Sequence, residues 1–503
     1  MTALDPTTPI GIVGAGTMGA GIGQVAATAG HPVRIYDAVP GVAEEAVGNI
    51  KARLTRLTDK GKLDPQQAQH IRDRLAPAAA IVDLAECGLV VEAVIEDIAV
   101  KRELFGMLEA ACGEEAVFAS NTSSLSITDI AAGMTRPERL AGMHFFNPAP
   151  LLPLVEVVRG EATSPDVADA LAATATVWGK TPVQCTSTPG FIVNRVARPF
   201  YAEAFRILGH GYIDPATLDA IMRESGGFRM GPCELTDLIG QDVNAAVTRS
   251  VWKALGKDPR FETSALQDEM VADGRLGRKS GGGFYDGKAK PVAATAEPCN
   301  EPQSLTVNGG STPLSALIDR LGRAGFPVHV TRGHGPVRIR PSENVVLQMT
   351  DGRTAADVMA ETGETTILVD LAHDFGSASR FAVAAGPDTP TAAVSDAVGC
   401  LQAAGADVTI VADTPGMIVA RTVAMLAAFG ADAVDAGVAS APDVDTAMRL
   451  GVNYPKGPVA WGDELGWDWV VGVLDALART EDKQRYLVSD DLRKRAVRGH
   501  TVG

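Results

Sequence analysis

The feature that most constrains the fold is a glycine-rich segment, GAGTMG at residues 14–19, between a short apolar run and a helical pattern rich in Ala and Gly. Residues 9–15 predict a strand, residues 17–29 a helix and residues 33–37 a second strand. Strand, helix and strand in this order form a βαβ unit with parallel strands. The alternation continues, so we expect an α/β Rossmann-type domain with a mostly parallel sheet over residues 1–187. Further apolar runs lie at 88–94, 117–120, 140–145 and 155–158, and helical patterns at 98–111 and 166–178.

The three glycines of this segment, and an acidic residue after it, stand where a dinucleotide-binding turn requires them. Gly14 allows a tight turn, Gly16 lets the backbone approach a pyrophosphate, and Gly19 lets the helix pack closely on the strand. Asp37 ends the second strand, where its carboxylate can accept hydrogen bonds from ribose hydroxyls and repel a 2′-phosphate. The sequence therefore predicts NAD as the cofactor. The residues expected to bind it are Gly14, Gly16, Thr17, Met18, Gly19 and Asp37.

Charge and cysteine content narrow the classes of partner. The chain has 61 acidic and 45 basic residues, a net charge of −16, so its field repels nucleic acids and anionic membranes. The six cysteines show neither CxxC spacing nor a neighbouring histidine pattern, so we expect reduced thiols and no metal site. The N-terminal residues MTALDPTTP lack the basic and apolar regions of a secretory signal, and no apolar stretch has the length of a membrane span. We therefore expect a cytoplasmic protein.

The pattern changes after residue 187. Long helical patterns at residues 191–209 and 215–223 are separated by Pro and Gly clusters, and no clear strand lies between them. This predicts an all-α domain over residues 188–287. Residues 288–304 are rich in Pro and Ala and have no periodicity, which predicts a linker.

An internal repeat with a constant offset of 226 residues connects the two parts of the chain: residues 188–195 recur at 414–421. Three pairs of segments match in this register, namely TPGFIVNR with TPGMIVAR, DAIM with DTAM, and GGFRMGP with VNYPKGP. Such agreement is hard to obtain by chance, so we expect a second all-α domain over residues 413–503. The same offset aligns VEVVRG with FAVAAG, which predicts a shortened, degenerate Rossmann-like segment over residues 305–412.

A histidine and a carboxylate near it are the first candidates for acid–base chemistry. His144 lies in AGMHFFNP at the end of a predicted strand, and Glu156 follows in the apolar run LVEVV. A carboxylate beside an imidazole fixes its tautomer and raises its basicity, as an enzyme needs in order to remove a hydroxyl proton. Taken singly, each residue also fits a purely structural role. In the run SNTSSLSIT, Ser123 or Ser124 could contact a ligand or cap a helix.

Six motifs together resemble the short-chain L-3-hydroxyacyl-CoA dehydrogenase family: GAGTMGAGI, VVEAVIEDIAVKRELF, SNTSSLSIT, GMHFFNP, LVEVV and TPGFIVNR, in this order. The tandem second copy is similar to the longer bacterial members associated with phenylacetate breakdown, which oxidise 3-hydroxyadipyl-CoA. The resemblance implies NAD-dependent oxidation of an (S)-3-hydroxyacyl-CoA to a 3-oxoacyl-CoA. The alternative substrate is 3-hydroxybutyryl-CoA, in fatty-acid or storage metabolism.

The resemblance also implies roles for individual residues. His144 corresponds to the general base of the family and Glu156 to its partner carboxylate. Ser123 and Asn194 would form hydrogen bonds with the reacting oxygen or with the thioester end of the acyl group. The positions that contact NAD in the family are Glu96, Lys101, Ser123, Asn147 and Lys279.

A local basic cluster stands out against the acidic background. Arg53, Arg56 and Lys60 share one helical face, with two further lysines beside them. The cluster is either a solvated helix face or a site for the phosphates of CoA, and we prefer the second interpretation. In the resemblance, Lys60 matches a CoA contact and Arg53 replaces a serine.

The second half lacks the residues on which this chemistry depends. At the 226-residue offset, Asp370, Ala382 and Ala420 stand where the first copy has the histidine, the carboxylate and the asparagine, and no glycine-rich loop precedes this copy. We expect the second copy to be non-catalytic. We also expect its helical domain to pack against the first, as two subunits of a dimer would, within one chain. Self-association of the whole chain as a homodimer is the other arrangement.

The sequence leaves alternatives for the acyl chain of the substrate and for the class of function. A basic side chain at the far end of the acyl pocket would favour a dicarboxylic substrate, and Arg195, Arg198 and Arg229 are candidates. A non-catalytic NAD-binding scaffold would have no physical need to retain all four catalytic candidates. A bifunctional hydratase–dehydrogenase would need a further domain, for which residues 305–412 are too short.

Overall fold

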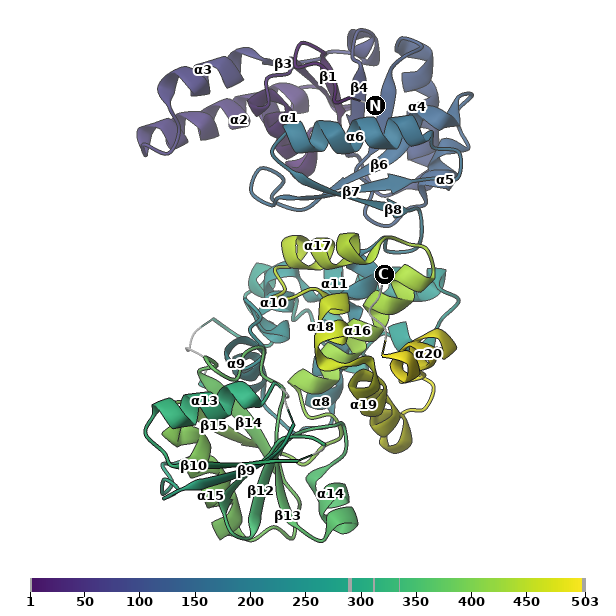
Figure 1. Cartoon of the computed structure of the whole chain (residues 1–503). Coiled ribbons are helices and arrows are strands. Elements are labelled where there is room, and N and C mark those ends of the chain that lie inside the picture. Colours follow the sequence, from purple (N-terminus) through teal and green to yellow (C-terminus); the bar gives the residue numbers. More distant parts are fainter. Residues whose placement is uncertain (1, 288–291, 311–312, 334, 500–503) are drawn as a thin grey trace. The chain divides into compact units, whose positions relative to one another are not determined.

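The computed structural model describes residues 2–287, 292–310, 313–333 and 335–499 (Figure 1). The chain divides into two compact units, one of Met1–Arg195 with Ala436–Val452 and one of Val196–Asp435 with Asn453–Gly503. Within the described ranges, no helix is long and apolar enough to cross a membrane, and no group of His, Cys, Asp and Glu side chains could hold a metal ion. All six cysteines are free thiols.

The first unit is built on an eight-stranded sheet in the order β3-β2-β1-β4-β5-β6-β7-β8. All neighbouring strands are parallel except β6 and β7, which are antiparallel, so the expected mostly parallel sheet is confirmed. The strand order reverses between β1 and β4, and ligands of such sheets bind at this point. The strands are β1 (Ile10–Val13), β2 (Val33–Tyr36), β3 (Leu75–Pro77), β4 (Leu89–Glu92), β5 (Val117–Ser120), β6 (Leu140–Phe145), β7 (Leu154–Arg159) and β8 (Thr181–Thr186).

Helices cover this sheet, which explains why strands such as β1 are apolar at every position and buried throughout. One core cluster joins α1, α2 and α6 to the strands, and the close approach of α1 is possible because Gly23 leaves room for Ile35. The helices of the unit are α1 (Thr17–Thr28), α2 (Val42–Asp59), α3 (Pro65–Asp73), α4 (Ile98–Ala111), α5 (Ile127–Ala131), α6 (Pro165–Val177), α7 (Val193–Val196) and α17 (Ala441–Gly451).

The second unit combines two sets of helices with a second sheet, in the order β10-β9-β11-β12-β13-β14-β15. Its strands are β9 (Leu305–Gly309), β10 (Val328–Arg332), β11 (Arg338–Ser342), β12 (Val345–Met349), β13 (Thr365–Val369), β14 (Arg380–Ala385) and β15 (Asp407–Val411). Its helices are α8 (Arg198–Gly209), α9 (Pro215–Glu224), α10 (Pro232–Ile239), α11 (Gln241–Ala254), α12 (Ala265–Ala272), α13 (Ser315–Arg323), α14 (Ala355–Thr362), α15 (Thr391–Ala403), α16 (Val419–Asp435), α18 (Pro458–Leu465), α19 (Trp467–Thr480) and α20 (Asp490–Arg498).

The second sheet is a partial copy of the first, as the repeat predicts. Strands β12 to β15 pair parallel, antiparallel and parallel, like β5 to β8, and β13 pairs with β14 in the register that β6 has with β7. The other end differs, because β11 lies antiparallel between β9 and β12. Gly309 ends β9 and Gly310 follows it, but the three-glycine pattern of the first copy is absent. The degenerate Rossmann-like segment is therefore present, with its nucleotide-binding end altered.

The helix expected over residues 191–209 is divided into α7 and α8, which corrects that prediction. Phe191 has a φ of 48°, so the helix cannot begin there. Pro199 has no backbone N–H and cannot continue the hydrogen-bond pattern of α7. In the second copy Met425 stands at the position of Pro199, and α16 is continuous.

The described part of the predicted linker is held against the second sheet. Residues 288–291 lie outside the described residues. Downstream of them, the Ala296 N–H donates to the Val408 carbonyl at 2.7 Å, and the Cys299 N–H donates to Gln402 Oε1 at 2.8 Å. The segment from residue 292 is therefore fixed along strand β15 and helix α15 of the second sheet.

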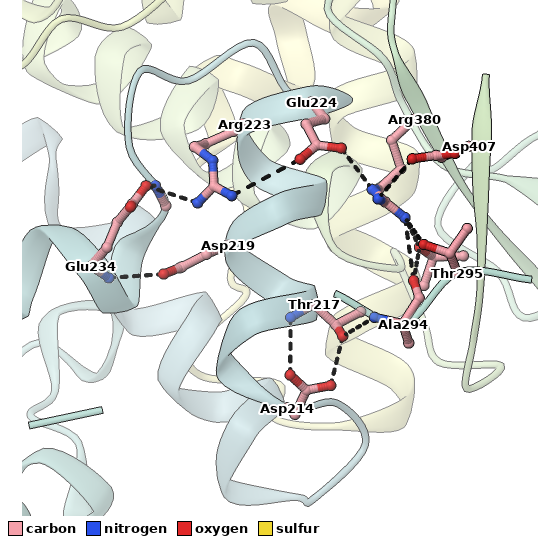
Figure 2. A network of polar contacts seen from close by, with 12 residues as sticks. Asp214, Thr217, Asp219, Arg223, Glu224, Glu234, Ala294, Thr295, Arg380 and Asp407 are labelled. Atoms are coloured by element: carbon pink, nitrogen blue, oxygen red, sulfur yellow. Dashed lines mark hydrogen bonds and ion pairs between the residues drawn. The ribbon is translucent and has the colours of Figure 1, made fainter. Parts of the chain in front are cut away.

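Helix α9 of the first copy packs on strand β14 of the second sheet. Figure 2 shows Arg380 of β14 between Glu224 of α9 and Asp407, at 2.9 and 3.2 Å, with further hydrogen bonds to the linker at Ala294 and Thr295. A buried arginine normally has such partners. The contact joins the first helical set to the second sheet.

The two helical sets also pack on each other, as the pseudo-dimer hypothesis predicts. Glu203 of α8 is fully buried, and its carboxylate contacts Arg421 Nε at 3.0 Å, Arg485 Nε at 3.4 Å and the Tyr486 hydroxyl at 2.7 Å. The three partners of Glu203 all come from the second copy, so the interface is charged and desolvated at its centre.

Deleting residues 300–503 is expected to abolish the soluble, active monomer. The deletion removes α16 and exposes the buried face of α8, where Phe200 and Glu203 lie. The truncated chain should self-associate or aggregate, which size-exclusion chromatography with light scattering and an NADH assay would detect. A soluble, fully active monomer would contradict the pseudo-dimer account.

Candidate active site

The antiparallel pair β6 and β7 places a histidine directly opposite a glutamate. His144 and Glu156 are partners in the strand register, and His144 Nδ1 lies 2.6 Å from Glu156 Oε2. A carboxylate can only accept a hydrogen bond, so Nδ1 carries the proton and Nε2 has the free lone pair. His144 is 6% exposed and Glu156 is fully buried. The imidazole can therefore accept a proton at Nε2.

The glutamate is itself held by backbone amides. Its other oxygen, Oε1, accepts hydrogen bonds from the N–H groups of Ile192 and Val193, at 3.0 and 2.9 Å. The positive φ of Phe191 turns the chain so that these two amides face the carboxylate. The ring of Phe191 lies 5.9 Å from that of His144, and the ring of Phe146 lies 4.6 Å from it. The two phenylalanines contact the imidazole, a role that the sequence pattern did not predict although both lie in the motifs GMHFFNP and TPGFIVNR.

The loop after β5 presents Ser123 beside a second carboxylate. Glu96 Oε1 accepts hydrogen bonds from the Ser123 N–H at 2.6 Å and from its hydroxyl at 3.0 Å. Asn194 Nδ2 donates to the Ser123 carbonyl at 3.2 Å. The cap of α5 is Ser126, whose Oγ accepts from the Asp129 N–H, so neither Ser123 nor Ser124 is needed for that purpose. The structure thus brings Ser123, Glu96 and Asn194 together.

Lys101 pairs with Glu96, the carboxylate that holds this loop. Its ammonium group is 1% exposed and lies 2.5 Å from Glu92 Oε1 and 3.4 Å from Glu96 Oε2. Glu92, which ends β4, also accepts hydrogen bonds from the Ser120 hydroxyl and the Val94 N–H. The sequence reasoning missed Glu92, although its place at the end of a buried strand was a usable signal. In this structure Lys101 orients Glu96 and so the serine loop.

The glycine-rich turn has the shape that a dinucleotide needs. Gly14 has a φ of 96°, and a Cβ there would lie 2.6 Å from the Ala93 carbonyl oxygen. A Cβ on Gly19 would lie 1.8 Å from the Gly14 carbonyl oxygen, whereas Gly16 faces open space. Helix α1 begins here without a side-chain cap, so its N–H groups are available to a phosphate. The residues therefore fit the pyrophosphate of NAD, with Thr17 and Met18 in the first turn.

Asp37 joins this turn to the next strand. Its Oδ2 accepts a hydrogen bond from the Ala15 N–H at 2.8 Å, and its Oδ1 accepts one from the Val39 N–H at 3.0 Å. Each carboxylate oxygen has a second lone pair, so both can still accept a ribose hydroxyl. Asp37 thus holds the turn and keeps acceptor capacity for a ligand.

Asp37→Ala is expected to weaken NADH binding by about 10- to 100-fold, the range for losing hydrogen bonds to a charged group. Binding of NADPH should weaken much less, because the repulsion of its 2′-phosphate is lost as well. Fluorescence titration with both cofactors measures the two dissociation constants, with the exposed Asp59→Ala as the matched control. An unchanged NADH to NADPH ratio would remove Asp37 from cofactor selection.

The other predicted site residues come from further elements of the chain. Asn147 is exposed just beyond the end of β6, and Lys60 is exposed at the end of α2. Arg53 on α2 donates a hydrogen bond to Gln24 of α1, so its guanidinium is partly engaged. Lys279 belongs to the second unit, where it pairs with Asp242 at 2.5 Å and lowers the pKa of that carboxyl.

The second copy keeps a carboxylate but has no imidazole at the position of His144. Asp370 follows β13 and accepts hydrogen bonds from the N–H groups of Ile418, Val419 and Ala420 at 2.8 to 3.0 Å. It makes the contacts that Glu156 makes in the first copy, from the strand that carries the histidine there. Burial raises the pKa of Asp370 to about 6. With its carboxylate used for the turn, this copy has no general base at the equivalent position.

Helix α17 of the second copy belongs to the first unit and packs on β7 and β8. Its last residue, Gly451, is so close that a Cβ would lie 2.7 Å from the Leu154 side chain and 3.1 Å from that of Val193. Leu154 begins the strand that carries Glu156, and Val193 donates its N–H to Glu156. In the repeat, α17 is the equivalent of α9, so each copy gives one helix to the other copy's sheet. The second copy thus packs on the residues that hold the Glu156 carboxylate in place.

A Rossmann sheet with a histidine–glutamate pair, a glycine-rich turn and a following helical domain defines an NAD-dependent dehydrogenase. Three domain families match the chain. They are the 3-hydroxyacyl-CoA dehydrogenase NAD-binding domain at residues 9–188, the 3-hydroxyacyl-CoA dehydrogenase C-terminal domain at 190–287 and 416–501, and the 3-hydroxybutyryl-CoA dehydrogenase reduced Rossmann-fold domain at 347–415. The chain belongs to the 3-hydroxyacyl-CoA dehydrogenase family and is an NAD-dependent enzyme of this class.

Individual relatives show the tandem form and the short form. The chain is 42% identical to the 3-hydroxyadipyl-CoA dehydrogenase of Escherichia coli K12, over 97% of both chains. A crystal structure titled 3-hydroxybutyryl-CoA dehydrogenase from the same organism matches with a TM-score of 0.89, 41% identity and 99% coverage of both chains. A probable 3-hydroxybutyryl-CoA dehydrogenase of Bacillus subtilis is 40% identical and covers 56% of this chain but 97% of its own length.

Proposed function

We propose that this protein oxidises the 3-hydroxyl of (S)-3-hydroxyadipyl-CoA with NAD, at a single site in the first copy. The observation that carries the proposal is the buried His144–Glu156 pair, in which Nε2 is the only imidazole nitrogen free to accept a proton. The reaction class is that of the family. The choice of the adipyl substrate is supported by the name of the E. coli relative that matches the full length of the chain.

In the proposed mechanism, His144 Nε2 removes the hydroxyl proton while the C3 hydride leaves the substrate. Glu156 stabilises the imidazolium that forms and keeps the ring in place. Ser123 and Asn194 are proposed to donate hydrogen bonds to the reacting oxygen or to the thioester carbonyl, which orients C3. The Ser123 hydroxyl would turn from Glu96 to the substrate to do so. NAD, when bound, supplies the hydride acceptor. The glycine turn with Asp37 would bind its pyrophosphate and ribose, and Glu96, Lys101, Asn147 and Lys279 are the further residues proposed to position it.

The CoA moiety is proposed to bind at α2. Arg53, Arg56 and Lys60 place positive charge on a helix of an otherwise acidic protein, and the CoA phosphates are the anionic part of the substrate. Lys60 and Arg56 are exposed and can reach a phosphate, whereas Arg53 contributes charge from its position against Gln24.

We also propose a cytoplasmic location and a monomer in which the two copies form an internal pseudo-dimer. The six free thiols agree with a reducing compartment. The buried Glu203 network supplies within one chain the kind of desolvated contact that an obligate dimer forms between chains.

The substrate proposal is tested by kcat/KM for NADH formation with adipyl, hexanoyl and butyryl forms of 3-hydroxyacyl-CoA. We expect the adipyl form to be preferred. Preference for the butyryl form would instead support a 3-hydroxybutyryl-CoA dehydrogenase, the function in the titles of the E. coli structure and the B. subtilis relative. Absence of turnover with every thioester would overturn the proposed function.

A further inference from the structure

Arg198 is a buried cation without a carboxylate partner. It is 5% exposed and begins α8. Five arginines are buried within the described part of the chain, and the other four all contact carboxylates. They are Arg139 with Glu109, Arg380 with Glu224 and Asp407, Arg421 with Glu203 and Glu481, and Arg485 with Glu203. A buried charge is normally paired, so the exception at Arg198 calls for an anion from outside the chain.

The contacts that Arg198 does make leave hydrogen-bond donors unused. Nη1 donates to Thr248 Oγ1 at 3.0 Å, and the guanidinium carbon lies 5.1 Å from the centre of the Tyr201 ring. Nε is buried and has no partner among the described residues. Nη2 also makes no hydrogen bond there, and it is not among the fully buried atoms.

Two tyrosines lie near Arg198 and, like it, can donate hydrogen bonds. No carboxylate among the described residues accepts a hydrogen bond from Arg198. Tyr454, from the second copy, has a buried hydroxyl without a partner among the described residues. Tyr454 and Tyr201 both lie close enough to Arg198 to interact with it electrostatically. Burial raises the pKa of both phenols, so they are neutral O–H donors at physiological pH. Arg198, Tyr201 and Tyr454 form what we name the donor cluster, and all three belong to the second unit.

We propose that the donor cluster binds the distal carboxylate of a dicarboxylic acyl-CoA, an inference that rests on the proposed function. A carboxylate would accept hydrogen bonds from the unused guanidinium nitrogens and from a phenol, and it would neutralise the buried charge. Arg198 follows Asn194 by four residues, which limits their Cα separation to about 14 Å. Of the three arginines considered from the sequence, Arg198 is the one that is buried, whereas Arg229 is exposed.

The test is the ratio of kcat/KM for 3-hydroxyadipyl-CoA to that for 3-hydroxyhexanoyl-CoA, which has the same number of acyl carbons and no distal carboxylate. Arg198→Met should lower this ratio by about 10- to 100-fold, mainly through KM for the adipyl substrate. Tyr454→Phe removes only a hydroxyl and keeps the packing, and it should lower the ratio by about 3- to 10-fold. The matched control, Arg229→Met, should leave the ratio unchanged.

The other possible results separate failure of this inference from failure of the proposed function. Equal losses with both substrates in Arg198→Met and an unchanged ratio in Tyr454→Phe would make Arg198 a structural residue and overturn the inference. Preference of the unaltered protein for the hexanoyl substrate would overturn it as well, while the dehydrogenase function stands. If Arg198→Met does not fold, the ratio in Tyr454→Phe decides. No turnover by the unaltered protein with any thioester would refute the proposed function itself.

Discussion

His144→Gln is expected to lower kcat by about a hundred- to ten-thousand-fold, the usual contribution of a general base. Glutamine can keep a hydrogen bond to Glu156 but cannot accept the hydroxyl proton at neutral pH. Because the imidazole acts on the substrate, the dissociation constant of NADH should remain nearly the same. Steady-state NADH formation and a fluorescence titration of NADH measure the two quantities.

A matched histidine separates this effect from a general effect of the substitution. His210 is exposed, stacks on Tyr212 and belongs to the second unit, whereas His144 belongs to the first. His210→Gln should have the kcat of the unaltered protein. Unaltered turnover in His144→Gln would remove His144 from the mechanism.

Glu203→Ala is expected to lower the free energy of unfolding of the second unit by about 3–5 kcal/mol, because it leaves buried arginine charge uncompensated. Arg421 keeps Glu481 at 2.7 Å, but Arg485 loses its carboxylate. Chemical unfolding followed by tryptophan fluorescence measures the loss. The control, Glu464→Ala, breaks a more exposed ion pair with Lys456 and should cost less than about 1 kcal/mol.

The Glu203 carboxylate also makes the stability of the interface between the two helical sets depend on pH. Burial alone would raise the pKa of Glu203, but Arg421 and Arg485 outweigh it and hold the pKa below the ordinary glutamate value. The stabilisation is therefore present above the ordinary pKa and is lost as the pH falls through the lower, folded value. Equal stability of Glu203→Ala and Glu464→Ala at neutral pH would contradict the assigned role of the network.

Local sequence patterns were sufficient to predict most of the first sheet. Strands β5 and β6 and helix α4 begin and end at the residues expected, because runs of buried apolar residues and helical periodicity are properties of the local sequence. The His144–Glu156 pair could be anticipated for a similar reason, since two consecutive strands carry it. The repeat also predicted the second sheet and its matching register.

Contacts between distant segments could not be anticipated in this way. Nothing in the local pattern around Gly451 indicates that α17 packs on β7, or that Lys101 is buried against Glu92. The offset correctly placed Asp370 at the position that His144 has in the first copy. It could not indicate that the Asp370 carboxylate holds the turn at Ile418, because that role depends on three-dimensional proximity. The domain boundaries at residues 187, 287, 304 and 412 remain predictions.

The central claim is that one chain contains one dehydrogenase site, in the first copy, and that the second copy supports it without binding cofactor. Isothermal titration calorimetry of the full-length protein with NADH measures the number of sites directly. The account predicts one NADH bound per chain. Two NADH molecules per chain, or none, would contradict it.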